Sequence, residues 1–165
     1  MRKWSVMAGL ALTLAAAGCE RPQKAPAEAP APAFRHALSD DISGEYRPVT
    51  SAAPQDVGLA SLHIGQRQTF DAWETGQGGA APLVIVLTTS AGAVRVGPDR
   101  YAVTDTALEF GGASAIGPVA LTARLDPGAL ATARRNLGDE TPVVRGVLTI
   151  ADRRTDVALR WWNGD

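Results

Sequence analysis

The feature that most constrains the fold is the way short apolar runs are interrupted by turn-forming residues. The chain has 17 glycines and 11 prolines among its 165 residues. Between these breaks the apolar runs are too short for most helices and suit strands. The run at 119–125 alternates apolar and other residues with period two, so its apolar side chains share one face. The sequence therefore predicts a mainly β domain.

Other segments agree with this prediction. The run at 82–89 is apolar on both faces, which is typical of a central strand. Gly97, Pro98 and Asp99 form a turn signal between two further strands. Near the end, 143–150 turns through 151–154 into 155–162 as a hairpin. We expect an antiparallel β-sandwich or small β-barrel that carries one short packed helix.

The expected helix lies at about 127–137. Asp126 is a good N-cap, Pro127 suits the first helical position, and Gly138 is a stop. An apolar stripe should face the sheet; it consists of Leu130, Ala133 and Leu137. In contrast, we expect 68–74 to be a strand.

The first nineteen residues have the layout of a secretory signal. Arg2 and Lys3 form a cationic head, 4–17 is largely apolar, and small residues precede Cys19. The apolar run is about 14 residues long, too short to span about 30 Å of hydrocarbon as a helix. We therefore expect residues 1–18 to be removed as a signal peptide.

Cys19 is the only cysteine, so the chain cannot form an internal disulfide. The segment Leu14-Ala15-Ala16-Ala17-Gly18-Cys19 resembles the lipobox of bacterial lipoproteins. The resemblance implies that the thiol receives a diacylglyceryl group, that a dedicated peptidase cuts before it, and that the new amine is acylated. The family most often has leucine where this chain has Ala16. The alternative is an ordinary cut nearby, for example after Ala17, with Cys19 unmodified.

The resemblance also implies a location in the cell. In proteobacterial lipoproteins an aspartate directly after the cysteine tends to retain the protein at the inner membrane, and this chain has Glu20 there. Two or three acyl chains hold a protein firmly to a bilayer. We therefore expect a lipid anchor in the outer membrane, with the folded domain in the periplasm.

Residues 19–37 form an expected Pro/Ala-rich tether, and 38–165 form a single domain. Prolines at 22, 26, 30 and 32 prevent a regular helix. An extended chain of this type spans about 3.1 Å per residue, so the tether reaches on the order of 55 Å. His36 lies within it and is expected to be solvated.

Charge and residue usage exclude several classes of function. Without residues 1–18 the chain has 14 basic and 17 acidic residues, a net charge of −3. That balance argues against nucleic acid as a partner, and it gives no polybasic segment for anionic lipid. The two histidines, His36 and His63, are far apart in sequence, and Cys19 is taken by the anchor. We expect no metal site and no cofactor.

The pair Trp161 and Trp162 is the most unusual feature of the domain. Neighbours on a strand point to opposite faces, so Trp161 is expected in the core beside Leu159. Trp162 shares its face with Arg160. It either covers the other side of the sheet or offers a platform on which a flat ligand stacks. Trp162 and Arg160 are therefore the candidate residues for binding a ligand or partner.

Catalytic arrangements are not evident. Ser61 and His63 share a strand face, but residues at that spacing are about 7 Å apart, and we expect His63 to be exposed. Nothing in the sequence sets the geometry of the carboxylate pairs; these are Asp71 with Glu74 and Asp139 with Glu140.

Two further segments have ordinary explanations. The glycine-rich stretch 111–117 leads into a strand and lacks lysine, so it is expected to connect strands and not to cradle phosphate. The charged tip at 152–156 is expected to be a solvated turn, with contact to a partner as the alternative.

Together these features predict a membrane-anchored envelope lipoprotein whose β-domain binds a protein partner and has no catalytic activity. The role would be in envelope assembly, or inhibitory by architectural analogy with small β-barrel lipoproteins that block lysozymes. The first alternative is a carrier of a small apolar ligand or lipid inside a barrel. The second is an uncharacterised envelope hydrolase that uses His63.

Overall fold

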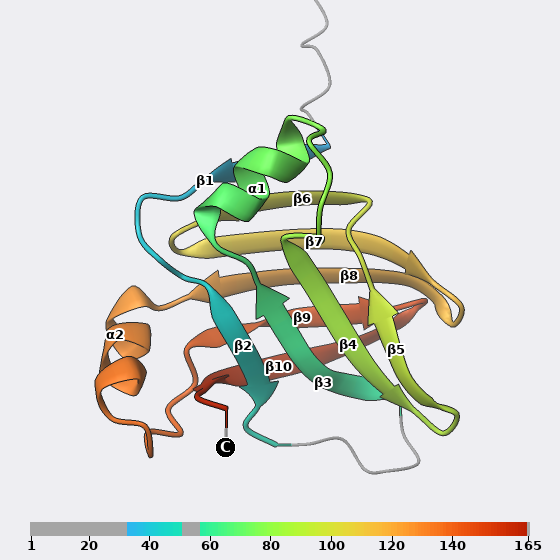
Figure 1. Ribbon diagram of the computed structural model, residues 1–165. Helices are drawn as coiled ribbons and strands as arrows, with labels where there is room; N and C mark the ends of the chain where they lie inside the picture. Colours follow the sequence, from blue (N-terminus) through green and yellow to red (C-terminus); the bar gives the residue numbers. More distant parts are fainter. Residues whose placement is uncertain (1–32, 51–56, 165) are drawn as a thin grey trace, which may run out of the picture. The chain divides into compact units, whose positions relative to one another are not determined.

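The computed structural model describes residues 33–50 and 57–164. Within these ranges ten strands form one sheet, and two short helices pack against it (Figure 1). The predicted signal peptide, Cys19 and most of the predicted tether lie outside the described residues. Neither described helix is long and apolar enough to cross a bilayer.

The elements are named in chain order. The first six are β1 (Phe34–Ala37), β2 (Gly44–Pro48), β3 (Gly58–Ile64), α1 (Arg67–Glu74), β4 (Leu83–Thr89) and β5 (Gly92–Val96). The others are β6 (Arg100–Thr104), β7 (Ala107–Ser114), β8 (Gly117–Leu125), α2 (Pro127–Arg135), β9 (Val144–Ile150) and β10 (Arg153–Trp162). The strands lie in the order β1-β6-β7-β8-β9-β10-β2-β3-β4-β5. Only the β1–β6 pair is parallel among these described strands.

The sheet curls so that β5 returns to β7 (Figure 1). The turn after β5 crosses β7 on its way to β6, and the Asp99 N–H donates to the Gly111 carbonyl at 2.8 Å. A Cβ at Gly112 would lie 2.3 Å from the Gly97 carbonyl oxygen, so a side chain there would block the crossing. The predicted fold class, a mainly β sandwich or barrel, is confirmed as a single curled sheet.

The inward face of the sheet is the hydrophobic core. The predicted alternation of 119–125 is confirmed, because Val119, Leu121, Ala123 and Leu125 are all buried. Residues paired with these positions on the neighbouring strands continue the buried rows across the sheet. One such row consists of Phe110 on β7, Leu121 on β8 and Leu148 on β9. Each fully buried side chain of this size contributes about 2 kcal/mol, so these rows hold the fold together.

Helix α2 is confirmed, but it ends at Arg135, earlier than predicted. The Asp126 side chain accepts a hydrogen bond from the Ala129 N–H at 3.0 Å, as expected of an N-cap. Leu130 and Ala133 are buried, whereas Leu137 is 61% exposed. The helix ends at Arg135, and the extended Asn136 turns Leu137 away from the core, so its place in the apolar stripe was wrong.

The prediction of a strand at 68–74 is wrong, and the segment forms a second short helix. These residues form most of α1, with Phe70 completely buried and Trp73 packed against the core. The Gly65 N–H donates to the Pro82 carbonyl at 2.7 Å and closes the base of this insertion. Eight residues with few apolar positions fit either period, so packing decides the outcome.

Three sequence boundaries also differ. Phe34–Ala37, assigned to the tether, form β1 and pair with β6. Gly111 and Gly112, assigned to a connection, lie inside β7. The last hairpin turns through Ala151 and Asp152 alone, with Ala151 at φ 54°. In each case strand pairing extends further than the local sequence suggests.

Candidate functional site

The predicted binding residues Trp162 and Arg160 lie on the outer face of β10, but they do not act on each other. The Arg47 guanidinium from β2 lies 3.3 Å from the Trp162 ring centroid. Arg47 also donates to Glu45 at 2.9 Å. Arg160 pairs with Glu140 at 3.3 Å instead. A flat ligand would have to displace Arg47 to stack on that face of Trp162.

Trp161 points inward, as predicted, and packs against the core. Its Nε1 is buried, and in the described part of the chain this atom has no hydrogen-bond partner. Gly44 makes room for the indole, since a Cβ there would lie 2.6 Å from Nε1. The tight fit indicates that the role of Trp161 is to pack against the core.

The other sequence candidates stay apart from any catalytic arrangement. Ser61 is 9% exposed and His63 is exposed on β3, as expected for His63. Within 33–50 and 57–164, no group of three or more His, Cys, Asp or Glu residues is placed to hold a metal ion. Hydrogen bonds from Thr141, first from its side chain and then from its N–H at 2.8 Å, lower the pKa of Asp139.

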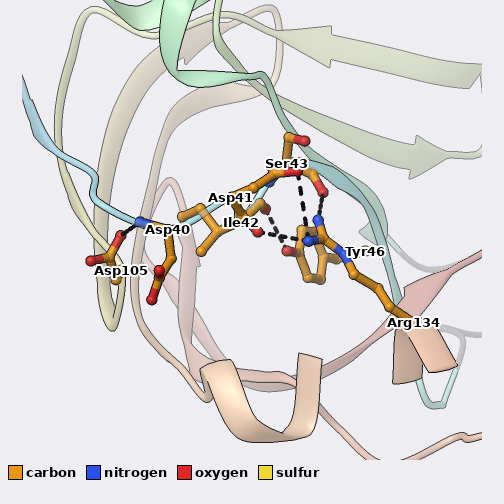
Figure 2. A network of polar contacts seen from close by, with 7 residues as sticks. All are labelled: Asp40, Asp41, Ile42, Ser43, Tyr46, Asp105 and Arg134. Carbon is orange, nitrogen blue, oxygen red and sulfur yellow. Dashed lines mark hydrogen bonds and ion pairs between the residues drawn. The ribbon is translucent and has the colours of Figure 1, made fainter. Parts of the chain in front are cut away.

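A polar network fixes the loop between β1 and β2 (Figure 2). Arg134, in the last turn of α2, donates to the carbonyls of Asp41 and Ser43, both at 2.7 Å. The Tyr46 hydroxyl donates to the Ile42 carbonyl at 2.6 Å. Helix α2 thereby holds the start of β2 through main-chain contacts.

The same loop is capped at its other end by Asp105. Its carboxylate accepts from the Ser39 and Asp40 N–H groups at 3.0 Å and from the Ser39 hydroxyl. Burial raises the pKa of Asp105, but these hydrogen bonds outweigh it, so the pKa falls below its usual value. Hydrogen bonding from Ser43 likewise lowers the pKa of Asp41, with a smaller contribution from Arg134. Both carboxylates are therefore ionised in the folded protein.

The titratable cluster around His36 corrects the expectation that this residue is solvated. Its side chain is only 8% exposed and points inward from β1. The ring Nδ1 lies 3.0 Å from Glu74 Oε1, and Nε2 lies 3.4 Å from Asp71 Oδ1. The carboxylate pair whose geometry the sequence left open therefore converges on one histidine.

Aromatic rings surround this cluster. The Phe70 ring lies 5.3 Å from both the His36 and the Tyr101 rings, and Phe34 packs 5.2 Å from Tyr101. Tyr101 is 3% exposed, and in the described ranges its hydroxyl has no hydrogen-bond partner. Burial and then the nearby Glu74 raise the pKa of Tyr101, so the hydroxyl stays neutral. The cluster fastens α1 to β1.

A second concentration of charge lies on the outward face of β1 and β6–β10. The exposed arginines there, called the arginine face, are Arg35, Arg100, Arg124, Arg145 and Arg154. The strands carry two carboxylates on the same face, Glu109 and Asp156. None of the ion pairs found in the described residues involves the arginine face. The arrangement leaves an excess of positive charge on this side of the sheet.

The central feature of the arginine face is a like-charged pair. Register places Arg124 of β8 directly opposite Arg145 of β9. Like charges in this position destabilise a sheet, so an anionic group bound between them would relieve a cost already present. A surface hollow of about 370 Å³ adjoins them and is also lined by Glu109 and Thr122. Two adjacent guanidinium groups suit carboxylates well.

A larger groove lies at the end of the sheet. It has a volume of about 560 Å³ and is lined by residues of the β2–β3 and β9–β10 ends. Leu148, Ile150 and Val157 supply apolar surface, and Arg153 and Asp156 supply charge. The apolar part of this groove offers a surface on which an apolar ligand could lie.

Sequence reasoning missed both charge clusters, because the arginine face depends on strand register and the His36 cluster depends on α1 lying over β1. The alternation of 119–125 did place Arg124 outward, but the partner of Arg124 on β9 could not be read from it. No family model, curated protein or solved structure matches the chain. The candidate site is therefore assigned from its geometry.

Proposed function

We propose that this protein is a lipid-anchored envelope protein whose β-domain binds a protein partner through the arginine face. The anchor would be Cys19, and the bound surface of the partner would be rich in aspartate and glutamate. The protein would act by binding at the membrane and not by catalysis.

The opposed Arg124 and Arg145 are the observation that carries the proposal. Both are exposed, both belong to strands in the middle of the sheet order, and their mutual repulsion has no local compensation among the ion pairs of the described residues. Carboxylates on a partner would supply that compensation, and arginine fits them in a bidentate geometry. A lipid tether adds to this by keeping the domain near envelope partners.

The anchor is tested separately from the binding surface. Cells grown with a labelled fatty acid should yield labelled wild-type protein and unlabelled Cys19→Ser protein. Equal labelling of both, or a processed wild-type chain with a free thiol, would refute the anchor.

The binding surface is tested by photo-crosslinking in intact cells. A photoreactive amino acid at Thr122, within the arginine face, should form a protein adduct. The same residue at Thr88, an exposed threonine on β4, should not. The double charge reversal Arg124→Glu with Arg145→Glu should reduce the Thr122 adduct about tenfold or more, because it replaces attraction with repulsion.

A matched control separates charge at this site from total charge. Arg95→Glu changes an exposed arginine on β5, outside the arginine face, and should leave the adduct unchanged. An adduct that survives the double reversal, or that forms equally at Thr88, would rule out the arginine face. The captured protein should also carry a cluster of carboxylates at the crosslinked segment.

The groove at the sheet end favours a second candidate function, the transport of a small apolar ligand. Its apolar surface from Leu148, Ile150 and Val157 could take an acyl chain, with Arg153 at a charged end. Native mass spectrometry of protein extracted from membranes would then show a bound lipid that Ile150→Glu removes. Protein without added mass would favour the binding of a protein partner.

A further inference from the structure

The sheet has an open strand edge at the groove between β10 and β3. β2 lies between these two strands and ends at Pro48, whereas β10 and β3 both continue past that end (Figure 1). β10 pairs with β9 along 153–159, but with β2 only along 159–162. On its β2 side, the first half of β10 therefore has no strand partner among the described strands.

The main-chain groups of this edge can be assigned from one hydrogen bond. The Ala158 carbonyl accepts from the Val49 N–H at 2.9 Å, so the main-chain groups of Ala158 point away from β9. Successive residues of a strand direct these groups to opposite sides, so the N–H and C=O groups of Asp156 and Arg154 face the groove. Within the described ranges, no main-chain group pairs with them.

We propose that an extended segment of the protein partner adds to this edge as a further strand. The inference rests on the proposed function, since it names the part of the partner that the domain holds. The groove is lined by β10 on one side and by Val57, Gly58 and Leu59 on the other. The open edge at 153–157 spans about 16 Å, the length of a typical short strand. In strand addition, main-chain hydrogen bonds supply affinity and side-chain contacts supply specificity.

The two faces of the groove predict the side chains of that segment. On the inward face, Ile150 and Val157 are partly buried and pack against the core. On the outward face, Arg154 belongs to the arginine face, and Arg145 lines the groove from β9, where it pairs with the small Ala158. Residues of an added strand alternate between these faces. The partner segment therefore alternates apolar residues with aspartate or glutamate.

Charge favours this segment over a neutral one. Arg145 and Arg153 line the groove, and Asp156 is the one carboxylate among its described lining residues. Arg145 also lines the hollow beside Arg124, so the groove is continuous with the arginine face. Apolar side chains in the groove give the partner a desolvated anchor, while its carboxylates lie against the arginines.

The open edge is tested first in the free protein, with residues 19–165 carrying Cys19→Ser so that no lipid is attached. Amide hydrogen exchange is measured for each residue and corrected for intrinsic rates. Arg154 and Asp156 should exchange at least about tenfold faster than Thr155 and Val157, whose N–H groups face β9. Equal protection of the four amides would mean that the edge is already paired, and would overturn the inference.

Strand addition itself is tested by photo-crosslinking in intact cells. A photoreactive amino acid at Thr155, an exposed residue in the groove, should capture the same protein as at Thr122. Asp156→Pro removes the N–H that faces the groove, a change that an unpaired strand edge tolerates. It should reduce the Thr155 adduct about tenfold, because a carbonyl of the bound segment loses its donor. Asp156→Ala, which keeps the N–H, should not reduce it.

The outcomes separate this inference from the proposed function. An adduct at Thr122 without one at Thr155, a Thr155 adduct with a lipid, or an adduct that Asp156→Pro leaves unchanged would overturn strand addition alone. Loss of the Thr122 adduct from the wild type would overturn the arginine face and this inference with it. Should circular dichroism show that Asp156→Pro does not fold, Arg154→Pro removes the other N–H that faces the groove, and it is compared with Arg154→Ala.

Discussion

The two ends of the segment from β1 to β2 are held in different ways. At its start, the side chain of His36, only 8% exposed, contacts Asp71 and Glu74 of α1. At its end, Arg134 donates to two main-chain carbonyls, and a guanidinium does not lose its charge in the accessible pH range. One end is held by contacts between side chains, and the other by a charged side chain that binds the main chain.

The two ends of this segment therefore position two different strands. The Arg134 end fixes where β2 begins, and β2 lies inside the sheet between β10 and β3. The His36 end fixes only β1, at the end of the strand order. Loss of the Arg134 contacts should therefore disturb the start of a central strand, whereas loss of the His36 contacts should affect mainly β1 and α1. Selective changes at each end should separate the two effects.

The largest effect is expected when the apolar support of the His36 end is removed. Phe70→Ala should lower the free energy of unfolding by about 3–5 kcal/mol, because Phe70 is the completely buried residue of α1. Urea denaturation measures it. Leu137→Ala, an apolar change at a residue 61% exposed, should cost less than about 0.5 kcal/mol. Similar losses in both variants would mean that α1 does not pack as described.

A smaller, pH-independent effect is expected at the other end. Arg134→Met keeps an apolar side chain of similar length but removes both donors to the loop. It should cost about 2 kcal/mol, since two carbonyls of the loop lose a charged donor. The loss should be the same at about pH 5 and about pH 8.

Arg135→Met is the matched control, because Arg135 is exposed and adjacent. It should be nearly neutral. A loss at Arg134 that differed between about pH 5 and about pH 8 would contradict a contact made by a permanently charged guanidinium.

Much of the fold was predictable because it depends on local patterns. The alternation of 119–125 determined which side chains are buried, and Asp126 identified the start of α2. Helix α1 was not predicted, because in eight residues Phe70 and Trp73 are the only large apolar side chains, and two positions are too few to establish a period. β1 was hidden for a related reason, since four residues after a proline-rich stretch carry too short a pattern.

The candidate sites were less predictable than the fold. His36 and Asp71 are 35 positions apart, and they meet only because α1 folds over β1. Arg124 and Arg145 meet only through the β8–β9 register. Trp162 and Arg160 were placed on one face by alternation, yet the arginine that stacks on Trp162 comes from β2. Residue type and spacing describe single strands, whereas these contacts join several.

The smallest effect concerns Asp105, at the junction between the two ends. Asp105→Asn should cost about 1 kcal/mol near neutral pH, since an amide cannot accept from both the N–H groups and the hydroxyl of the loop. The pKa of Asp105 is lowered in the folded state, so its stabilisation is present above the unfolded value of about 3.9 and is lost as the pH falls through the folded value. The difference between wild type and variant should therefore shrink below about pH 4, which denaturation at several pH values measures. A difference that grew on acidification would contradict the assignment of Asp105 as an ionised cap of this loop.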